Sequence, residues 1–324
     1  MKRKIGSVLL ALAAAALFAA YAPAHAGEAK AGEDGFTIAE TDEFSLEMHF
    51  LFQTMASTSQ DRYRFEGDLY SWFNLKKAQS GQVFRVDIPN RNDTVLPEEQ
   101  SFRVRRAWVT FGGRAFYPWL HWEAEFEGFG DNEGPELLQA FVRLGDPQRY
   151  SATIGQFKVP FDMFQLAPEW KRLFPEASTV SQSVTPEYDL GAMFSARSED
   201  GHWLARAAFQ NGSGRNESNS DDSIETTLRL EFQNEGGFDY DLSPIGRSES
   251  TQYTFGAAYT RDFAGQRIDS ETGRFCFEGL SRDCTESPNL ADGVELFGAL
   301  RLPTLQLNAS FQSWKLRERR NVIH

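Results

Sequence analysis

The chain has 324 residues, of which 41% are hydrophobic and 24% charged, and its formal net charge is -13. This acidic balance argues against nucleic acid as a partner, because the neutralisation of phosphates needs clustered Lys and Arg. A mean hydropathy of -0.47 argues against a helical membrane protein but is compatible with a membrane barrel, in which only alternate residues face lipid.

A basic and then apolar leader opens the chain. Lys2, Arg3 and Lys4 precede an Ala/Leu-rich stretch over 5–22, and Ala24-His25-Ala26 has the small-x-small pattern of a cleavage site. We expect residues 1–26 to be a cleaved signal peptide, whose removal makes the mature chain three charges more negative. A retained membrane anchor is the alternative, and the polar acidic stretch that follows the leader disfavours it.

Apolar and polar residues alternate over many segments of about ten residues, which is the pattern of half-buried strands. The predicted strands are residues 43–57, 101–112, 120–130, 137–145, 150–157, 189–197, 203–211, 224–233, 251–262, 294–302 and 305–315. Residues 61–75 also alternate, and either a strand or part of a long loop fits them, so the role of 61–100 stays open. The segment lengths match a tilted membrane strand of about 9–11 residues better than the soluble β-sandwich that is the alternative.

The connections between these strands alternate in length. Short turns are predicted near 113–119, 146–149, 199–201 and 303–304, and longer loops over 158–188, 212–223 and 263–292. Residues 234–250 are an exception, since they are long where a short turn is due. Short turns on one side and long loops on the other are typical of outer-membrane barrels, as are aromatic residues near the short turns. These are Tyr117, Trp119, Trp122, Tyr150 and Trp203. The sequence therefore predicts one domain over 27–324.

The two cysteines, Cys276 and Cys284, are separated by seven residues. Because an exported chain passes through an oxidising periplasm, we expect a disulfide that closes a short loop. No His lies between them and no second Cys pair exists, so neither a metal site nor any other cofactor is expected.

Three segments in order resemble the phosphate-selective porin O/P family. Residues 102–107 (FRVRRA), followed by Phe111-Gly112-Gly113, resemble its second-strand signature. Residues 154–161 (IGQFKVPF) resemble the strand that leads into its constriction loop, and 189–193 (DLGAM) resemble the strand that leaves that loop. The resemblance is best over 101–211.

This resemblance implies an all-β transmembrane antiparallel barrel of the 16-stranded porin type, assembled as a homotrimer in the outer membrane. Its third external loop, here 158–188, would fold into the pore. It also implies passive diffusion of small hydrophilic solutes, with anions such as phosphate as candidates, and contact with membrane lipid and lipopolysaccharide. Only about eleven strands are predicted and no aromatic residue ends the chain, so we expect C-terminal strands to be missing, with a smaller complete barrel as the alternative.

The basic candidates for the pore lining are in two groups. Arg103, Arg105 and Arg106 are on one strand, where simple alternation puts the first two on one face and Arg106 on the other. An Arg facing lipid at the midplane would cost about 2–4 kcal/mol, so a bulge, a subunit interface or a position near the headgroups is needed. Lys158, Lys171 and Arg172 are in the expected constriction loop.

Acidic residues oppose these cations. Glu123, Glu125 and Glu127 alternate along one strand and are expected to face the lumen, and acidic residues also accompany the loop cations. Opposed charges of this kind produce a transverse field. Because the chain is acidic, a general arginine row is favoured over a site built for phosphate.

Two other classes of function stay open. Some outer-membrane barrels are rim-site hydrolases, but His49, His121, His202 and His324 show no Ser or Asp constellation and no catalytic motif is present. An enzyme is therefore not expected. A surface adhesin or receptor carried by the long loops is the third reading.

Overall fold

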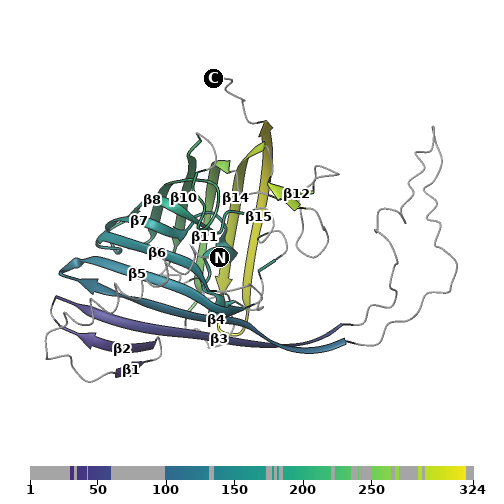
Figure 1. The fold of residues 1–324 in the computed structure, drawn as a ribbon. Helices are drawn as coiled ribbons and strands as arrows, with labels where there is room; N and C mark the ends of the chain where they lie inside the picture. The colour runs from purple at the N-terminus through teal and green to yellow at the C-terminus, as the bar shows by residue number, and fades with distance from the viewer. Residues whose placement is uncertain are drawn as a thin grey trace, which may run out of the picture.

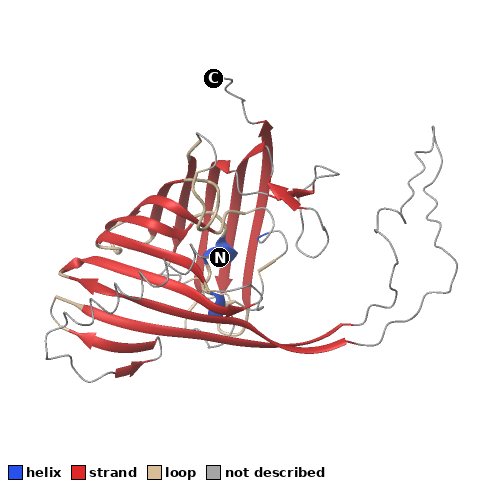
Figure 2. Cartoon of the chain, viewed as in Figure 1, coloured by secondary structure: helices blue, strands red, loops and turns tan. Residues whose placement is uncertain are grey.

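A computed structural model describes residues 30–32, 35–41, 43–59, 99–130, 135–172, 177–178, 181, 185–219, 223–234, 240, 242, 250–263, 267–269, 284–286 and 289–318. The fold is all-β, with one large antiparallel sheet and very short helices (Figures 1 and 2). The signal peptide, residues 61–75 and Cys276 lie outside the described residues, so the predictions made for them stay predictions.

The large sheet has 13 strands, each antiparallel to the next in the sheet. They are β1 (Lys30–Gly32), β2 (Gly35–Glu40), β3 (Ser45–Ser59), β4 (Glu99–Ala115), β5 (Tyr117–Gly130), β6 (Glu136–Gly145), β7 (Tyr150–Lys158), β8 (Tyr188–Arg197), β9 (Trp203–Gln210), β10 (Glu225–Gln233), β11 (Gln252–Phe263), β14 (Asn289–Arg301) and β15 (Gln306–Glu318). A separate two-stranded sheet pairs β12 (Arg267–Asp269) with β13 (Cys284–Glu286).

The eleven predicted strands are confirmed as β3 to β11, β14 and β15. The prediction missed β1 and β2, because the chain before residue 41 is acidic and β2 offers only six residues of alternation. It also missed the β12–β13 hairpin, which lies inside a segment predicted as loop. Each missed strand is too short for a period of two to be recognised.

The sheet curls but does not close in the described part of the chain. The strand order runs from β1 to β15, so these two strands are its edges. Figure 1 shows the strands rising in a curved wall around an interior that holds a loop.

The two faces of the sheet differ in chemistry. On β10, Leu228 and Leu230 are 47% and 50% exposed, whereas Thr227, Arg229 and Glu231 between and beside them are buried. The same alternation continues across the neighbouring strands, so one face is apolar and exposed and the other is polar. We call the face that the interior loop covers the inner face. A barrel that places water inside and lipid outside requires this arrangement.

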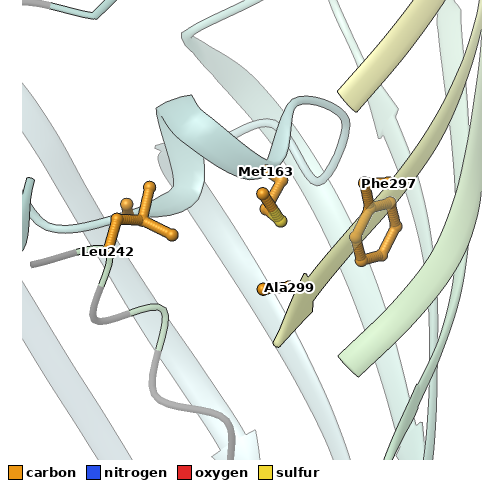
Figure 3. Close-up of a cluster of buried hydrophobic side chains, with 5 residues drawn as sticks. Met163, Leu242, Phe297 and Ala299 are labelled. Carbon is orange, nitrogen blue, oxygen red and sulfur yellow. The ribbon is translucent and has the colours of Figure 1, made fainter. Parts of the chain in front are cut away.

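Between β7 and β8, the described residues 159–172, 177–178, 181 and 185–187 belong to the interior loop. It contains α3 (Met163–Leu166) and the 3-10 helix η1 (Glu169–Lys171), which lie inside the curve of the sheet (Figure 2). Figure 3 shows Met163 near Phe297 and Ala299 of β14, and Leu242 beside the loop. No helix in the described ranges is long and apolar enough to cross a membrane.

Candidate functional site

A β-bulge in β4 determines where its three arginines lie. Gln53 pairs with Arg106 and Thr54 with Val104, so Arg105 is the additional residue. Simple alternation is therefore wrong here, because a bulge shifts the faces by one residue. Arg106 lies on the inner face and donates from Nη1 to Gln53 Oε1 at 2.7 Å.

The bulge also brings position 103 to the same face as position 106. The two positions lie opposite Met55 and Gln53, which are two residues apart on β3. Arg106 is 6% exposed, and its guanidinium is 5.7 Å from the ring centroid of Trp108. This guanidinium is thus packed against the wall of the sheet and is not projected into open space.

A buried ion cluster fixes the interior loop to its own strand. Glu169 Oε1 accepts from Lys158 Nζ at 2.9 Å and from Arg172 Nη2 at 3.0 Å. Burial by itself would raise the pKa of the Glu169 carboxyl, but the two cations outweigh burial and hold this pKa below its ordinary value. The carboxylate is therefore charged and neutralises part of the basic charge of the loop.

Arg229 on β10 fixes the same loop to a second part of the wall. Its Nη1 donates to the Phe161 carbonyl oxygen at 2.5 Å and to Glu295 Oε2 at 3.1 Å, and its Nε donates to Glu231 Oε2 at 3.1 Å. Glu295 Oε1 in turn accepts from the Met163 backbone N–H at 3.1 Å. The loop is thus held by buried charged groups on β10 and β14.

A second segment reaches the loop from the short-turn end of the sheet. Tyr240 and Leu242 are its described residues here, and they belong to the connection between β10 and β11, which the sequence marked as too long for a turn. The Leu242 N–H donates to the Lys171 carbonyl oxygen at 2.8 Å, and its side chain packs with Met163 (Figure 3). The Tyr240 hydroxyl donates to Glu231. The interior is therefore narrowed from both ends.

Described residues of the inner face line the following two cavities. The acidic cavity, about 660 Å³, lies between β3–β6 and the loop, and three glutamates line it together with Lys158. These glutamates are Glu123, Glu125 and Glu169. Thr110 Oγ1 donates to Glu125 at 2.8 Å, and the Gln139 amide donates to Glu123.

The arginine cavity, about 360 Å³, lies at the short-turn end, where Pro147 and Gln148 belong to its wall. Arg143, Arg197 and Arg206 line it. None of these three forms an ion pair with a carboxylate within the described ranges. They make neutral contacts instead, to Thr153 Oγ1 at 3.4 Å, the Gly201 carbonyl at 3.2 Å and the Tyr240 hydroxyl at 3.4 Å, respectively.

The two cavities share four lining residues. Glu123, Gln139, Lys158 and Leu166 belong to both walls. They come from β5, β6, the end of β7 and α3, so they mark the position where one cavity leads to the other. The acidic cavity and the arginine cavity are therefore adjacent along the inner face.

The predicted site residues are distributed unevenly around the two cavities. Glu123, Glu125 and Lys158 line the cavities. Arg172 and Arg106 are not lining residues, although Arg172 pairs with Glu169 in the wall of the acidic cavity. Glu127 is buried opposite Trp108 and lines neither cavity, and Lys171 contributes its carbonyl to Leu242. For Arg103 and Arg105, only the pairing of β4 with β3 indicates which face of the sheet each position is on.

Sequence reasoning missed the three arginines of the arginine cavity. A signal for them existed, because each is on the polar side of a predicted strand and near a predicted short turn. Each is also isolated in the sequence. Only the pairing of β6 to β9 brings them to one cavity.

Comparison with known families identifies the fold. The family model described as phosphate-selective porin O and P matches residues 80–268, which is more than half of the chain and includes β4 to β11. No curated protein matches the chain.

Proposed function

Because the chain belongs to the phosphate-selective porin O and P family of bacterial outer-membrane porins, we propose that it forms a water-filled channel for small hydrophilic solutes and favours anions. The observation that carries this proposal is the arginine cavity. Three arginines line this cavity, and none of them forms an ion pair with a carboxylate among the described residues.

The arrangement of the interior supports a channel. The loop narrows the space inside the sheet but leaves two cavities that meet at shared residues. Polar side chains line the path, while the opposite face of the sheet presents large exposed apolar side chains. Contact of that face with lipid and lipopolysaccharide, and assembly as a homotrimer, are part of the proposal.

The balance of charge supports a preference for anions. Three arginines line the arginine cavity, and Glu123 is the one acidic residue among its lining residues. Lys158 lines it too but pairs with Glu169. Fixed charge of one sign in a cleft raises the local concentration of the opposite ion. In the acidic cavity Lys158 pairs with Glu169, so the field that attracts anions is at the short-turn end.

Reversal potentials in planar bilayers across a salt gradient test this proposal. We expect an anion-selective channel, and the combined change of Arg143, Arg197 and Arg206 to Gln should lower the anion-to-cation permeability ratio by roughly tenfold. The matched control is Arg114→Gln, since Arg114 is also on the inner face but pairs with Glu40 at 3.8 Å. A cation-selective wild-type channel would contradict the preference for anions.

The competing functions have less support. His49 lies 4.0 Å from Glu47, and His202 Nδ1 contacts the Gln233 carbonyl at 2.8 Å. Neither contact contains a nucleophile. Swelling of liposomes with sugars of graded size separates a channel from a rim-site hydrolase or a loop-borne receptor, because only an open channel admits the sugars.

A further inference from the structure

The arginine cavity has apolar lining residues, which an inorganic ion such as phosphate would not contact favourably. Phe141 and Phe157 form one buried cluster with Met193 packed against it, and all three line the cavity. A wall that combines guanidinium groups with an apolar patch fits a ligand that has both kinds of surface.

The arginines are held close to this patch. The guanidinium of Arg143 lies 5.1 Å from the ring centroid of Phe141 on the same strand. Arg206 is opposite Ser195 on β8, two residues from Met193. Charged and apolar groups therefore alternate around one small volume, and a single small molecule can touch both.

Hydroxyl groups complete the polar side. Ser151 pairs with Ser195 and Thr153 with Met193 across β7 and β8, and all four line the cavity. Hydroxyl groups donate to anions without adding charge. A volume of about 360 Å³ lies within the range of about 300–1,000 Å³ that is typical of sites for small organic ligands.

We propose that the arginine cavity is a binding subsite for small organic anions, with the carboxylate or phosphate head at the arginines and the apolar body against Phe141, Phe157 and Met193. This proposal rests on the proposed channel function and narrows its substrate class. Such a site would select anions by the size and apolarity of their organic part as well as by their charge.

Block of the chloride current in planar bilayers tests this proposal. Benzoate is compared with acetate, and phenyl phosphate with inorganic phosphate. Each pair shares the same charged group and differs in the aromatic ring. We expect each aromatic anion to block at a concentration roughly tenfold lower than its partner, as the burial of a ring would give. The pair that blocks more strongly identifies the preferred head.

Variants assign the effect to the cavity. Met193→Ser should reduce the ratio of acetate to benzoate blocking concentrations by roughly threefold or more. Met55→Ser, a change of the same residue type on β3 outside both cavities, should leave this ratio unchanged. Arg143→Gln should weaken block by benzoate and acetate alike. If Met193→Ser does not fold, Ser195→Leu provides the converse test and should increase the ratio.

The outcomes separate the two proposals. An anion-selective channel that is blocked equally by benzoate and acetate overturns the organic-anion subsite and leaves the channel function in place. A ratio that Met55→Ser changes as much as Met193→Ser also overturns the subsite. A cation-selective channel overturns the proposed preference for anions itself.

Discussion

Charged side chains on the inner face divide into those with a carboxylate partner and those without. Arg229 lies between Glu231 and Glu295, and Glu169 binds two cations. A paired charge produces little field beyond its partner, whereas an unpaired charge acts on the mobile ions around it. The arginine cavity can therefore set selectivity while the paired groups hold the loop.

The ion cluster at Glu169 should make docking of the interior loop sensitive to acid. The pKa of Glu169 is lowered in the folded protein, so its contribution is present above the ordinary pKa of a glutamate and is lost as the pH falls through the lowered value. We expect the loop to become susceptible to proteolysis below about pH 4, and Glu169→Gln to make it susceptible at neutral pH. Limited proteolysis across pH 3–7 measures this.

A surface ion pair provides the control for that experiment. Glu199 lies 3.4 Å from Arg149 in a turn, and its side chain is 86% exposed. Such pairs contribute about 0–1 kcal/mol, so Glu199→Gln should leave the acid response unchanged. A Glu169→Gln loop that is as protected as wild type at neutral pH would show that Glu169 does not hold it.

At the scale of elements, the loop depends on strands that are remote in the sequence. Phe161 and Met163 are held by Arg229 on β10 and Glu295 on β14, and the Phe161 ring is 5.1 Å from that of Trp314 on β15. The pore is thus narrowed by a loop that is fixed at its β7 end and again across the interior.

Removal of the Arg229 contact should widen the channel. Arg229→Met leaves Glu231 and Glu295 buried without their cation, and a broken buried ion pair costs about 3–5 kcal/mol. We expect a lower thermal unfolding temperature and a larger, noisier single-channel conductance, because the Phe161 carbonyl loses its donor. Planar-bilayer recordings and thermal unfolding in detergent measure these two effects.

Arg301→Met is the matched control. Arg301 is on β14 and its Nη1 donates to Gln252 Oε1 at 2.8 Å, near the short turn between β14 and β15. Its replacement should leave the conductance unchanged. An Arg229→Met channel with wild-type conductance would show that the loop does not depend on this contact.

The sequence predicted the long strands well and the site only in part. A period of two is a local property, so residues 101–112 or 224–233 reveal their strands without knowledge of any partner. The bulge at Arg105 is a property of pairing; the arginines on one strand indicated a bulge only as one of three possibilities. For the same reason, Arg143, Arg197 and Arg206 were not recognised as a group, and nothing local predicted that Leu242 would contact Lys171.

At the scale of the whole molecule, the sheet separates two environments. Its outer face carries exposed apolar side chains such as Phe194, Leu230, Phe255 and Leu296, and its inner face carries the polar path. A sheet edge leaves backbone groups unpaired, which hydrocarbon does not tolerate. The form that is inserted in the membrane must therefore satisfy the edges at β1 and β15 by pairing, within or between chains.

The two faces should respond differently to the same charge. Leu230→Arg places a guanidinium on the outer face in mid-strand, where contact with lipid costs about 2–4 kcal/mol of folding free energy. Gln312→Arg places it on the inner face of β15, opposite Glu295, where water and a carboxylate are near, so its cost should be well below that of Leu230→Arg. Urea unfolding in phospholipid bilayers measures both, and an equal loss of stability would show that the outer face does not contact lipid.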